Sequence, residues 1–92
     1  MLEFDWDENK EIFNVLKHGV DFKTAIKTFY DPHRYIFADQ KHGAIEKRFI
    51  CLGKVEDRIL TVRFVYREDK IRIFGAGYWR NGKDIYEKEK KN

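Results

Sequence analysis

Phosphate binding is the chemistry that the residue types of this chain favour most. Four arginines are expected on one side of a predicted sheet: Arg48, Arg63, Arg67 and Arg72. A guanidinium grips phosphate through two parallel hydrogen bonds, whereas a lysine ammonium acts as a point charge. Apolar residues are expected among these arginines: Ile50, Leu52, Val65 and Phe74. An exposed surface that is both apolar and arginine-rich suits RNA or an acidic protein segment.

The last predicted hairpin produces this arrangement. If the hairpin turns at residues 68–69, Val65 pairs with Arg72, and residues opposite one another share a face. The other face is then continuously apolar: Phe49, Cys51, Leu60, Val62, Phe64, Tyr66, Ile71 and Ile73. A register slipped by one residue would bury Arg48 or Arg63 at high cost. The alternative to phosphate binding is a solvated face whose arginine stems cover its apolar side chains.

The group that would transfer protons is harder to assign from the sequence. An ordinary histidine pKa near ~6.5 suits proton transfer at neutral pH, which makes His18 the first candidate. Lys17 and His18 also close a predicted helix, where cations are favourable, so a structural role is equally open. Glu46 is a second candidate base, with a surface salt bridge as its alternative. His33 and His42 fall in predicted turns.

Two aromatic residues follow the last predicted strand directly. Gly75 and Gly77 have no side chain, and Tyr78 and Trp79 follow Gly77 directly. Aromatic side chains of this kind stack on unpaired bases in single-stranded RNA sites. The structural alternative is that they anchor the C-terminal helix to the sheet. Trp6, near the N-terminus, is assigned to the core.

Composition indicates one soluble domain spanning residues 1–92. The chain is 42% hydrophobic and 38% charged, with a formal net charge of +3. No apolar run approaches the ~20 residues that span a bilayer, and no secretory leader is recognisable, so a cytoplasmic location is expected. Cys51 cannot form an internal disulfide and is expected in the core, and the three histidines show no metal-ligand spacing.

Two amphipathic helices are predicted before the sheet. The first runs from about residue 6 to residue 18, with Asp5 as N-cap and Gly19 as its stop. Its apolar stripe is expected to face the core: Ile12, Phe13 and Leu16. The second helix is capped by Asp21 and ends at residues 31–32. Both helices are expected to pack on the apolar face of the sheet.

From residue 33 onward the hydrophobic period becomes two, which is typical of strands. Strands are predicted at residues 34–38, 45–53, 58–66 and 70–76, and a further short strand at residues 2–4 is conceivable. The turns are short enough to join antiparallel neighbours. A charged helix over residues 79–91 follows, with a candidate break at Asn81-Gly82. The predicted fold is therefore α+β, with two N-terminal helices on one face of a four-stranded antiparallel meander and a C-terminal helix.

Three segments together match a known pattern. They read FDWDENKEIFNVLKHGVDFKTAIKTFYDP, KRFICLG and ILTVRFVYREDKIRIFGAGYWRNGKDIYE. In this order they resemble the BrnT family of type II toxins over nearly the whole chain. The resemblance implies a fold like that of RelE-type ribonuclease toxins. It also implies a cytoplasmic endoribonuclease that cleaves RNA without a metal or other cofactor and inhibits translation.

The same resemblance implies a specific kind of partner. A BrnA-like antitoxin with a ribbon-helix-helix dimer would neutralise the toxin in a hetero-oligomer and bring it to promoter DNA. One position departs from the family pattern. Many members read ISAR, a small residue and Thr where this chain reads FGAGYWR, so Gly77 replaces the family's arginine and Arg80 is a candidate substitute.

The expected reaction is attack of the RNA 2'-hydroxyl on the adjacent phosphate, which needs proton transfer and charge stabilisation. The predicted catalytic residues are His18, Arg48, Arg67, Arg72 and Arg80. The predicted RNA-binding residues are Lys17, Arg63, Tyr78 and Trp79. Two other functions stay open: a non-catalytic, degenerate toxin that acts as a co-repressor with its antitoxin, and a stand-alone nucleic-acid-binding module.

Overall fold

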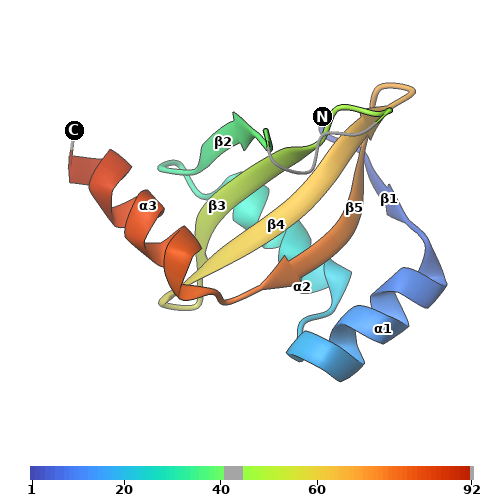
Figure 1. Ribbon diagram of the computed structural model, residues 1–92, viewed down its shortest axis with the longest axis horizontal. Coiled ribbons are helices and arrows are strands. Elements are labelled where there is room, and N and C mark those ends of the chain that lie inside the picture. The colour runs from blue at the N-terminus through green and yellow to red at the C-terminus, as the bar shows by residue number, and fades with distance from the viewer. Residues whose placement is uncertain (41–44, 92) are drawn as a thin grey trace.

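The computed structural model describes residues 1–40 and 45–91, which form a mixed five-stranded sheet with helices on both faces and at one edge (Figure 1). The elements are β1 (Phe4–Trp6), α1 (Glu8–His18), α2 (Phe22–Ile26), the 3-10 helix η1 (Lys27–Tyr30), β2 (Tyr35–Ala38), β3 (Phe49–Val55), β4 (Arg58–Arg67), β5 (Lys70–Gly77) and α3 (Arg80–Lys91). The strand order is β1-β5-β4-β3-β2, and β1 is parallel to β5. The predicted antiparallel meander of four strands is confirmed, although its second strand begins at Phe49 and not at residue 45. The short N-terminal strand makes the sheet mixed.

The predicted register of the last hairpin is confirmed. Glu68 and Asp69 both have positive φ, at 52° and 66°, and Val65 lies opposite Arg72. Such turns match the right-handed twist of the strands they join. Further along, the register shifts between Arg63 and Phe64, which adds an extra residue to β5. This β-bulge was not predicted, and it alters the direction of the side chains that follow it.

The core lies between one face of the sheet and the segment formed by α2 and η1. Phe22, Ala25 and Phe29 from this segment are buried against strand residues that include Val62 and Phe64. The predicted cap of the second helix is confirmed, since the backbone N–H of Thr24 donates to the Asp21 carboxylate at 2.7 Å. Cys51 and Trp6 belong to this core as predicted, with Cys51 fully buried and Trp6 packed against it.

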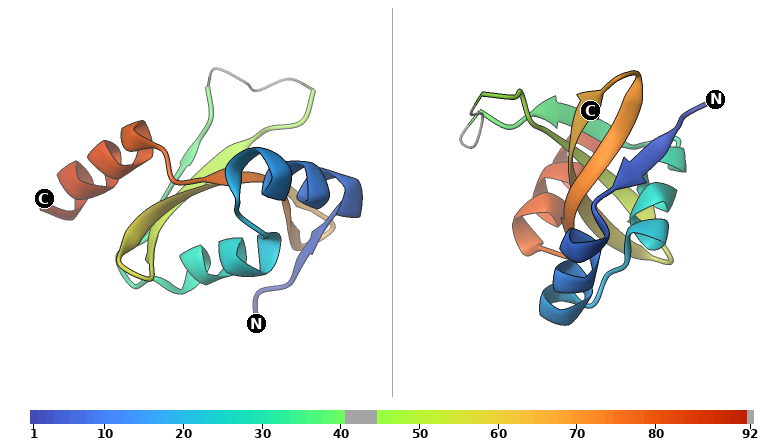
Figure 2. Two further views of the ribbon diagram at one scale, coloured as in Figure 1. Left: turned by 90° about the horizontal axis from the view of Figure 1, so that it is seen from below. Right: turned by 90° about the vertical axis from the view of Figure 1, so that its right-hand side faces the viewer.

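Helix α1 contradicts the predicted packing. Its apolar stripe does not face the core, because Ile12 is 58% exposed and Leu16 is 79% exposed. The residue that α1 buries against β5 is instead Asn14. Since a helix turns about 100° per residue, Ile12 and Leu16, two positions on either side of Asn14, must point the other way. Only α2 and η1 therefore cover the core face, while α1 lies beside the end of β5 (Figure 2).

The start of α1 was also placed wrongly. The N-cap is Asp7, whose carboxylate accepts hydrogen bonds from the backbone of Asn9 and Lys10 at 2.8 and 3.2 Å. Asp5 instead belongs to β1 and pairs with Arg72 at 3.3 Å. The two aspartates are equivalent as capping residues by type. Pairing of β1 with β5 extends the backbone through Asp5 and delays the helix.

Helix α3 packs on the sheet face opposite α2 and is continuous through the predicted break (Figure 2). Gly82 is buried, and a Cβ there would collide with the Thr61 hydroxyl and touch Leu52 at 3.1 Å. The glycine therefore lets the helix approach the sheet closely. One turn further along α3, Tyr86 donates a hydrogen bond to Asp31 at 2.6 Å, which ties α3 to the turn that ends η1.

Candidate functional site

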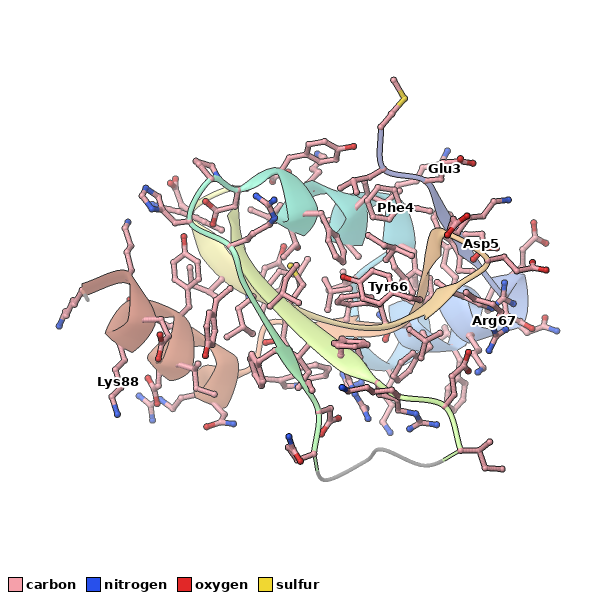
Figure 3. The ribbon with its side chains drawn as sticks, turned by 90° about the horizontal axis from the view of Figure 1, so that it is seen from above. Glu3, Phe4, Asp5, Tyr66, Arg67 and Lys88 are labelled. Carbon is pink, nitrogen blue, oxygen red and sulfur yellow. The ribbon has the colours of Figure 1, made fainter. Side chains whose placement is uncertain are left out.

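The arginine-rich side of the sheet faces α1 across a cleft. One part of this cleft lies against α1 and is lined by Asn9, Lys10, Phe13, Asn14, Lys17, His18, Arg63, Phe74, Gly75 and Trp79. The adjoining part lies over the hairpin of β4 and β5 and is lined by Asp7, Lys10, Glu46, Arg48, Val65, Arg67, Arg72, Ile73 and Phe74. Lys10 and Phe74 line both parts, so we treat them as one feature, the basic cleft. Figure 3 shows Arg67 at the end of the molecule opposite Lys88 of α3.

Phe74 lies at the centre of the basic cleft. The Arg48 guanidinium is 5.0 Å from its ring centroid, and the Arg63 guanidinium is 5.1 Å from it. Cation–π contacts of this length hold both arginines beside the ring. Phe74 reaches this position because the β-bulge inserts it between the residues that pair with Arg63 and Phe64. The bulge thus organises two of the four predicted arginines around one aromatic platform.

The remaining arginines are held by carboxylates. Arg67 donates two hydrogen bonds to Glu46, at 2.7 and 3.2 Å, and Arg72 lies 3.3 Å from Asp5. The bidentate hydrogen bond from Arg67 keeps the pKa of Glu46 below its ordinary value. Glu46 is therefore ionised and forms an ion pair with Arg67, which was the predicted alternative to a role as general base. Ion pairs as exposed as these are weak because solvent screens them, so a phosphate can compete for either guanidinium.

His18 lies at the other end of the basic cleft, in contact with Trp79. Their ring centroids are 5.1 Å apart and the rings meet edge to face. The C-terminal turn of α1 supplies His18 and Lys17, and Gly19 ends the helix with a left-handed φ of 71° as predicted. The loop before α3 supplies Trp79. Residues from two distant parts of the sequence therefore meet at this end of the cleft.

Gly77 accommodates the ring of Trp79. A Cβ at Gly77 would lie 2.6 Å from the Trp79 Cε2 atom, which is closer than side-chain carbons approach one another. An arginine at this position, which the family pattern expects, would not fit while Trp79 occupies this place. The glycine and the tryptophan are therefore a matched pair.

Two predicted site residues lie outside the basic cleft. Arg80 and Tyr78 line a neighbouring hollow together with Arg58 and Lys83. The Arg58 guanidinium stacks on the Tyr78 ring at 3.8 Å, and Tyr78 also packs against the core. The only predicted residue that lines both hollows, within the part of the chain described, is Trp79.

The expected apolar patch among the arginines is largely covered. Leu52 is buried beneath α3, and Val65 is buried between arginine side chains, whereas Ile50 and Phe74 remain half-buried. Lys10 was not predicted as a site residue, but it lines both parts of the cleft from α1. The available signal was its position seven residues before Lys17, about two helical turns, which places both lysines on one side of the predicted helix. His42 lies outside the described residues.

Residues 1–40 and 45–91 contain neither a cluster of metal ligands nor a membrane-spanning helix. No three His, Cys, Asp or Glu side chains gather there as metal ligands would. None of the helices there is both long enough and apolar enough to cross a membrane. The free thiol of Cys51 is deeply buried, and this burial raises its pKa to about 12, so it is not a nucleophile at neutral pH.

Comparison with known families identifies the chain. The pattern of one family, described as the ribonuclease toxin BrnT of type II toxin-antitoxin systems, matches residues 6–82. A search of curated protein sequences finds no significant match. The matched segment contains α1, the whole meander and every residue that lines the basic cleft. The chain therefore belongs to the BrnT family of ribonuclease toxins of type II toxin-antitoxin systems.

Proposed function

We propose that this protein is an endoribonuclease that cleaves RNA in the basic cleft without a metal ion and so inhibits translation. The observation that carries the proposal is that His18 lines one part of the basic cleft, and Arg48, Arg67 and Arg72 line the adjoining part, with Lys10 and Phe74 common to both. Positive charge of this density matches the RNA backbone, and a histidine supplies the proton transfer that the chemistry needs. The arrangement is in keeping with the RelE-like fold that the family resemblance implies.

Charge stabilisation falls to the arginines of the cleft. When the 2'-hydroxyl attacks phosphorus, negative charge builds up on the non-bridging oxygens, and fixed cations stabilise that state. Arg48 is held by Phe74 rather than by a carboxylate, so it is ready to bind a phosphate. Arg67 and Arg72 would exchange Glu46 and Asp5 for the phosphate oxygens. Because these ion pairs are weak, the exchange costs little.

Proton transfer is assigned to His18. A neutral imidazole can remove the proton of the attacking hydroxyl, and its charged form can protonate the leaving 5'-oxygen. The contact with Trp79 orients the ring at the edge of the cleft. Lys17 and Arg63 would hold the flanking phosphates, and the exposed part of Trp79 would stack on a base.

Arg80 and Tyr78 have a more distant role in this proposal. They would meet the RNA only where the strand continues past Trp79 into the neighbouring hollow. Cations there, Arg58 and Lys83 among them, would then bind the backbone without touching the scissile phosphate. The arginines inside the basic cleft, rather than Arg80, would thus supply the positive charge that the family's arginine provides at the position of Gly77.

A BrnA-like antitoxin is proposed as the protein partner. Its ribbon-helix-helix dimer would neutralise the toxin in a hetero-oligomer and carry it to promoter DNA, so that DNA is reached only through the antitoxin. A second function rests on the family resemblance, which implies an arginine where this chain has Gly77. Without that arginine, the chain could act as a non-catalytic co-repressor that still binds the antitoxin.

Turnover separates the two functions. The purified chain, freed of antitoxin, is incubated with single-stranded RNA in excess EDTA. Cleavage is expected, with a loss of about 100-fold in kcat/KM for Arg48→Ala, as for removal of one charge-stabilising group. Lys88→Ala, at the far end of α3, is the matched control and should cleave normally. Intact RNA, together with normal growth on expression of the chain, would leave the co-repressor role in place of the enzyme.

A further inference from the structure

Helix α1 presents a row of large apolar side chains to solvent. Their exposed fractions are 58% for Ile12, 67% for Phe13, 42% for Val15 and 79% for Leu16. We name these four residues the α1 stripe. They lie on the side of the helix away from Asn14, the residue that is buried against β5. Contiguous apolar surface of this kind on a soluble domain marks an interaction site.

The direction of the α1 stripe is fixed by hydrogen bonds. Asn14 donates to the carbonyl of Val20 at 2.8 Å and to that of Ala76 at 3.0 Å, and both bonds are buried. Glu11, on the same side as Asn14, accepts from the backbone of Phe22 at 2.9 Å. Turning the stripe inward would break all of these bonds and leave buried polar groups unpaired. The helix therefore displays its apolar side outward as a stable feature.

The size of the α1 stripe limits what can cover it. A helix of this length, eleven residues, is about 16 Å long and roughly 10 Å wide. A stable complex takes about 800 Å² from each partner, several times this area. Two copies joined only through α1 would thus bury too little surface. A lasting partner has to extend from the stripe onto adjacent surface.

The adjacent surface that shares a residue with the stripe is the basic cleft. Phe13 belongs to the stripe and also lines the cleft beside Lys10 and Lys17. Among the described residues, the ion pairs involve neither lysine. A segment that packs on Ile12 and Leu16 and then crosses Phe13 would meet these two cations first. Acidic side chains on that segment would complement them.

We infer that the α1 stripe docks an amphipathic segment of the antitoxin, whose apolar side chains cover Ile12 and Leu16 and whose acidic side chains cross Phe13 to Lys10 and Lys17. This inference rests on the proposed function as an antitoxin-controlled ribonuclease. The segment blocks RNA sterically and by charge, because it closes the part of the cleft that contains His18. Inhibition then requires no rearrangement of the catalytic groups.

The test uses two single substitutions that leave the cleft lining untouched, Leu16→Glu and Ile12→Glu. The probe is the antitoxin of the same toxin-antitoxin system, purified and titrated against the free toxin. Each substitution is expected to raise Kd roughly 30-fold, the effect of losing one central interface side chain. RNA cleavage by the free variants should stay at the wild-type rate and resist added antitoxin. Leu2→Glu, at an exposed leucine outside α1, is the matched control and should bind normally.

Several results would overturn the inference. Unchanged Kd values for both variants would exclude the stripe as the docking surface. A wild-type dimer that Leu16→Glu separates, with unchanged antitoxin affinity, would make a second copy the occupant. Binding of the wild-type chain to anionic lipid vesicles that Leu16→Glu abolishes, again with unchanged antitoxin affinity, would assign the stripe to a membrane surface.

The enzyme proposal and the docking inference fail in different ways. If the wild-type chain does not cleave RNA but both variants lose antitoxin binding, the docking surface stands and the enzyme proposal falls. If cleavage is normal and the variants bind normally, only the docking inference falls. Circular dichroism verifies folding of each variant, and Leu16→Gln replaces Leu16→Glu where the charged side chain prevents folding.

Discussion

The side chain of Asn14 on α1 hydrogen-bonds both backbone groups of Ala76 at the end of β5. Its amide donates to the Ala76 carbonyl at 3.0 Å and accepts from the Ala76 N–H at 3.1 Å. Strand β1 pairs with β5 only as far as Ile73, so Ala76 has no strand neighbour on that side. Asn14 therefore takes the place of a strand and fixes α1 against the sheet.

Substitution of Asn14 by alanine should destabilise the fold strongly. The change leaves two buried backbone groups of Ala76 and the carbonyl of Val20 without their partner. Each unpaired buried group costs about 1–3 kcal/mol, and partial access of water offsets some of this, so a total of about 2–4 kcal/mol is expected. Urea denaturation measures the loss. Asn9→Ala, at an exposed position of the same helix, should change stability by less than about 0.5 kcal/mol.

Substitutions at Gly77 and Trp79 should change the free energy of unfolding by amounts that do not add. Gly77→Ala places a Cβ against the indole ring, and such overpacking typically costs about 1–3 kcal/mol. Once Trp79→Ala has removed the ring, the same Cβ no longer meets its three nearest atoms, so the double variant should be about as stable as Trp79→Ala alone. A double-mutant cycle from thermal or urea unfolding measures this coupling. Additive losses would show that the ring does not depend on the glycine.

Acid stability should depend on Asp31. Burial by itself raises the pKa of this carboxylate, but hydrogen bonds from Tyr86 and from the backbone of Lys54 and His33 outweigh it and lower the pKa. The Asp31 carboxylate therefore binds a proton more readily in the unfolded chain than in the folded protein. Its contribution to the free energy of unfolding is complete above the ordinary pKa of about 4. This contribution disappears as the pH falls through the lowered pKa of the folded protein. Asp31→Asn should lose stability at neutral pH and show a flatter fall in acid. Asp57→Asn is the control.

Tyr86 provides the complementary test at alkaline pH. Burial and the hydrogen bond to Asp31 raise the pKa of its phenol to about 12. A raised folded pKa means that its stabilisation is complete below the unfolded value of about 10 and is lost as the pH rises through 12. Tyr86→Phe should lower the free energy of unfolding by about 1–2 kcal/mol at pH 7 and weaken the alkaline dependence. An unaltered free energy would mean that the bond to Asp31 contributes nothing.

Arg72, inside the basic cleft, should contribute more to the rate of RNA cleavage than Arg80, outside it. Arg72→Ala removes a guanidinium from the basic cleft and should reduce RNA cleavage about 100-fold. Arg80→Ala, in the neighbouring hollow, should lower kcat/KM by less than about 5-fold through weaker RNA binding, in proportion to one lost phosphate contact. Steady-state kinetics at two salt concentrations separates the effects. Equal losses in kcat for both variants would place Arg80 at the scissile phosphate.

The strand register was accessible from the sequence because its causes are local. Alternating residues and the tight turn at Glu68-Asp69 determine which side chains share a face, and burying an arginine excludes the slipped alternatives. The arginine-rich face and the capped start of α2 follow from the same short-range rules. The insertion of Phe74 by a β-bulge did not, since the bulge depends on how two complete strands align.

The position of α1 was decided by the tertiary structure. An amphipathic stripe predicts that its apolar side chains will be covered, but it does not identify the covering surface, and Ile12 and Leu16 are exposed here. Asn14, a polar residue by sequence, occupies the buried side because β5 offers it unpaired backbone groups there. Asp5 belongs to β1 and Asp7 caps α1 because β1 pairs with β5, a strand far away in the sequence.

Residue types and their alternation predict an arginine-rich face, whereas the packing of distant segments determines which other side chains lie beside it. Residue types and alternation put Arg48, Arg67 and Arg72 on one face, since side chains two residues apart point the same way. Which histidine, lysine and aromatic residue join them depends on where α1 and the loop before α3 approach the sheet. That approach is set by contacts between distant segments, above all Asn14 with Ala76, and no local pattern encodes it.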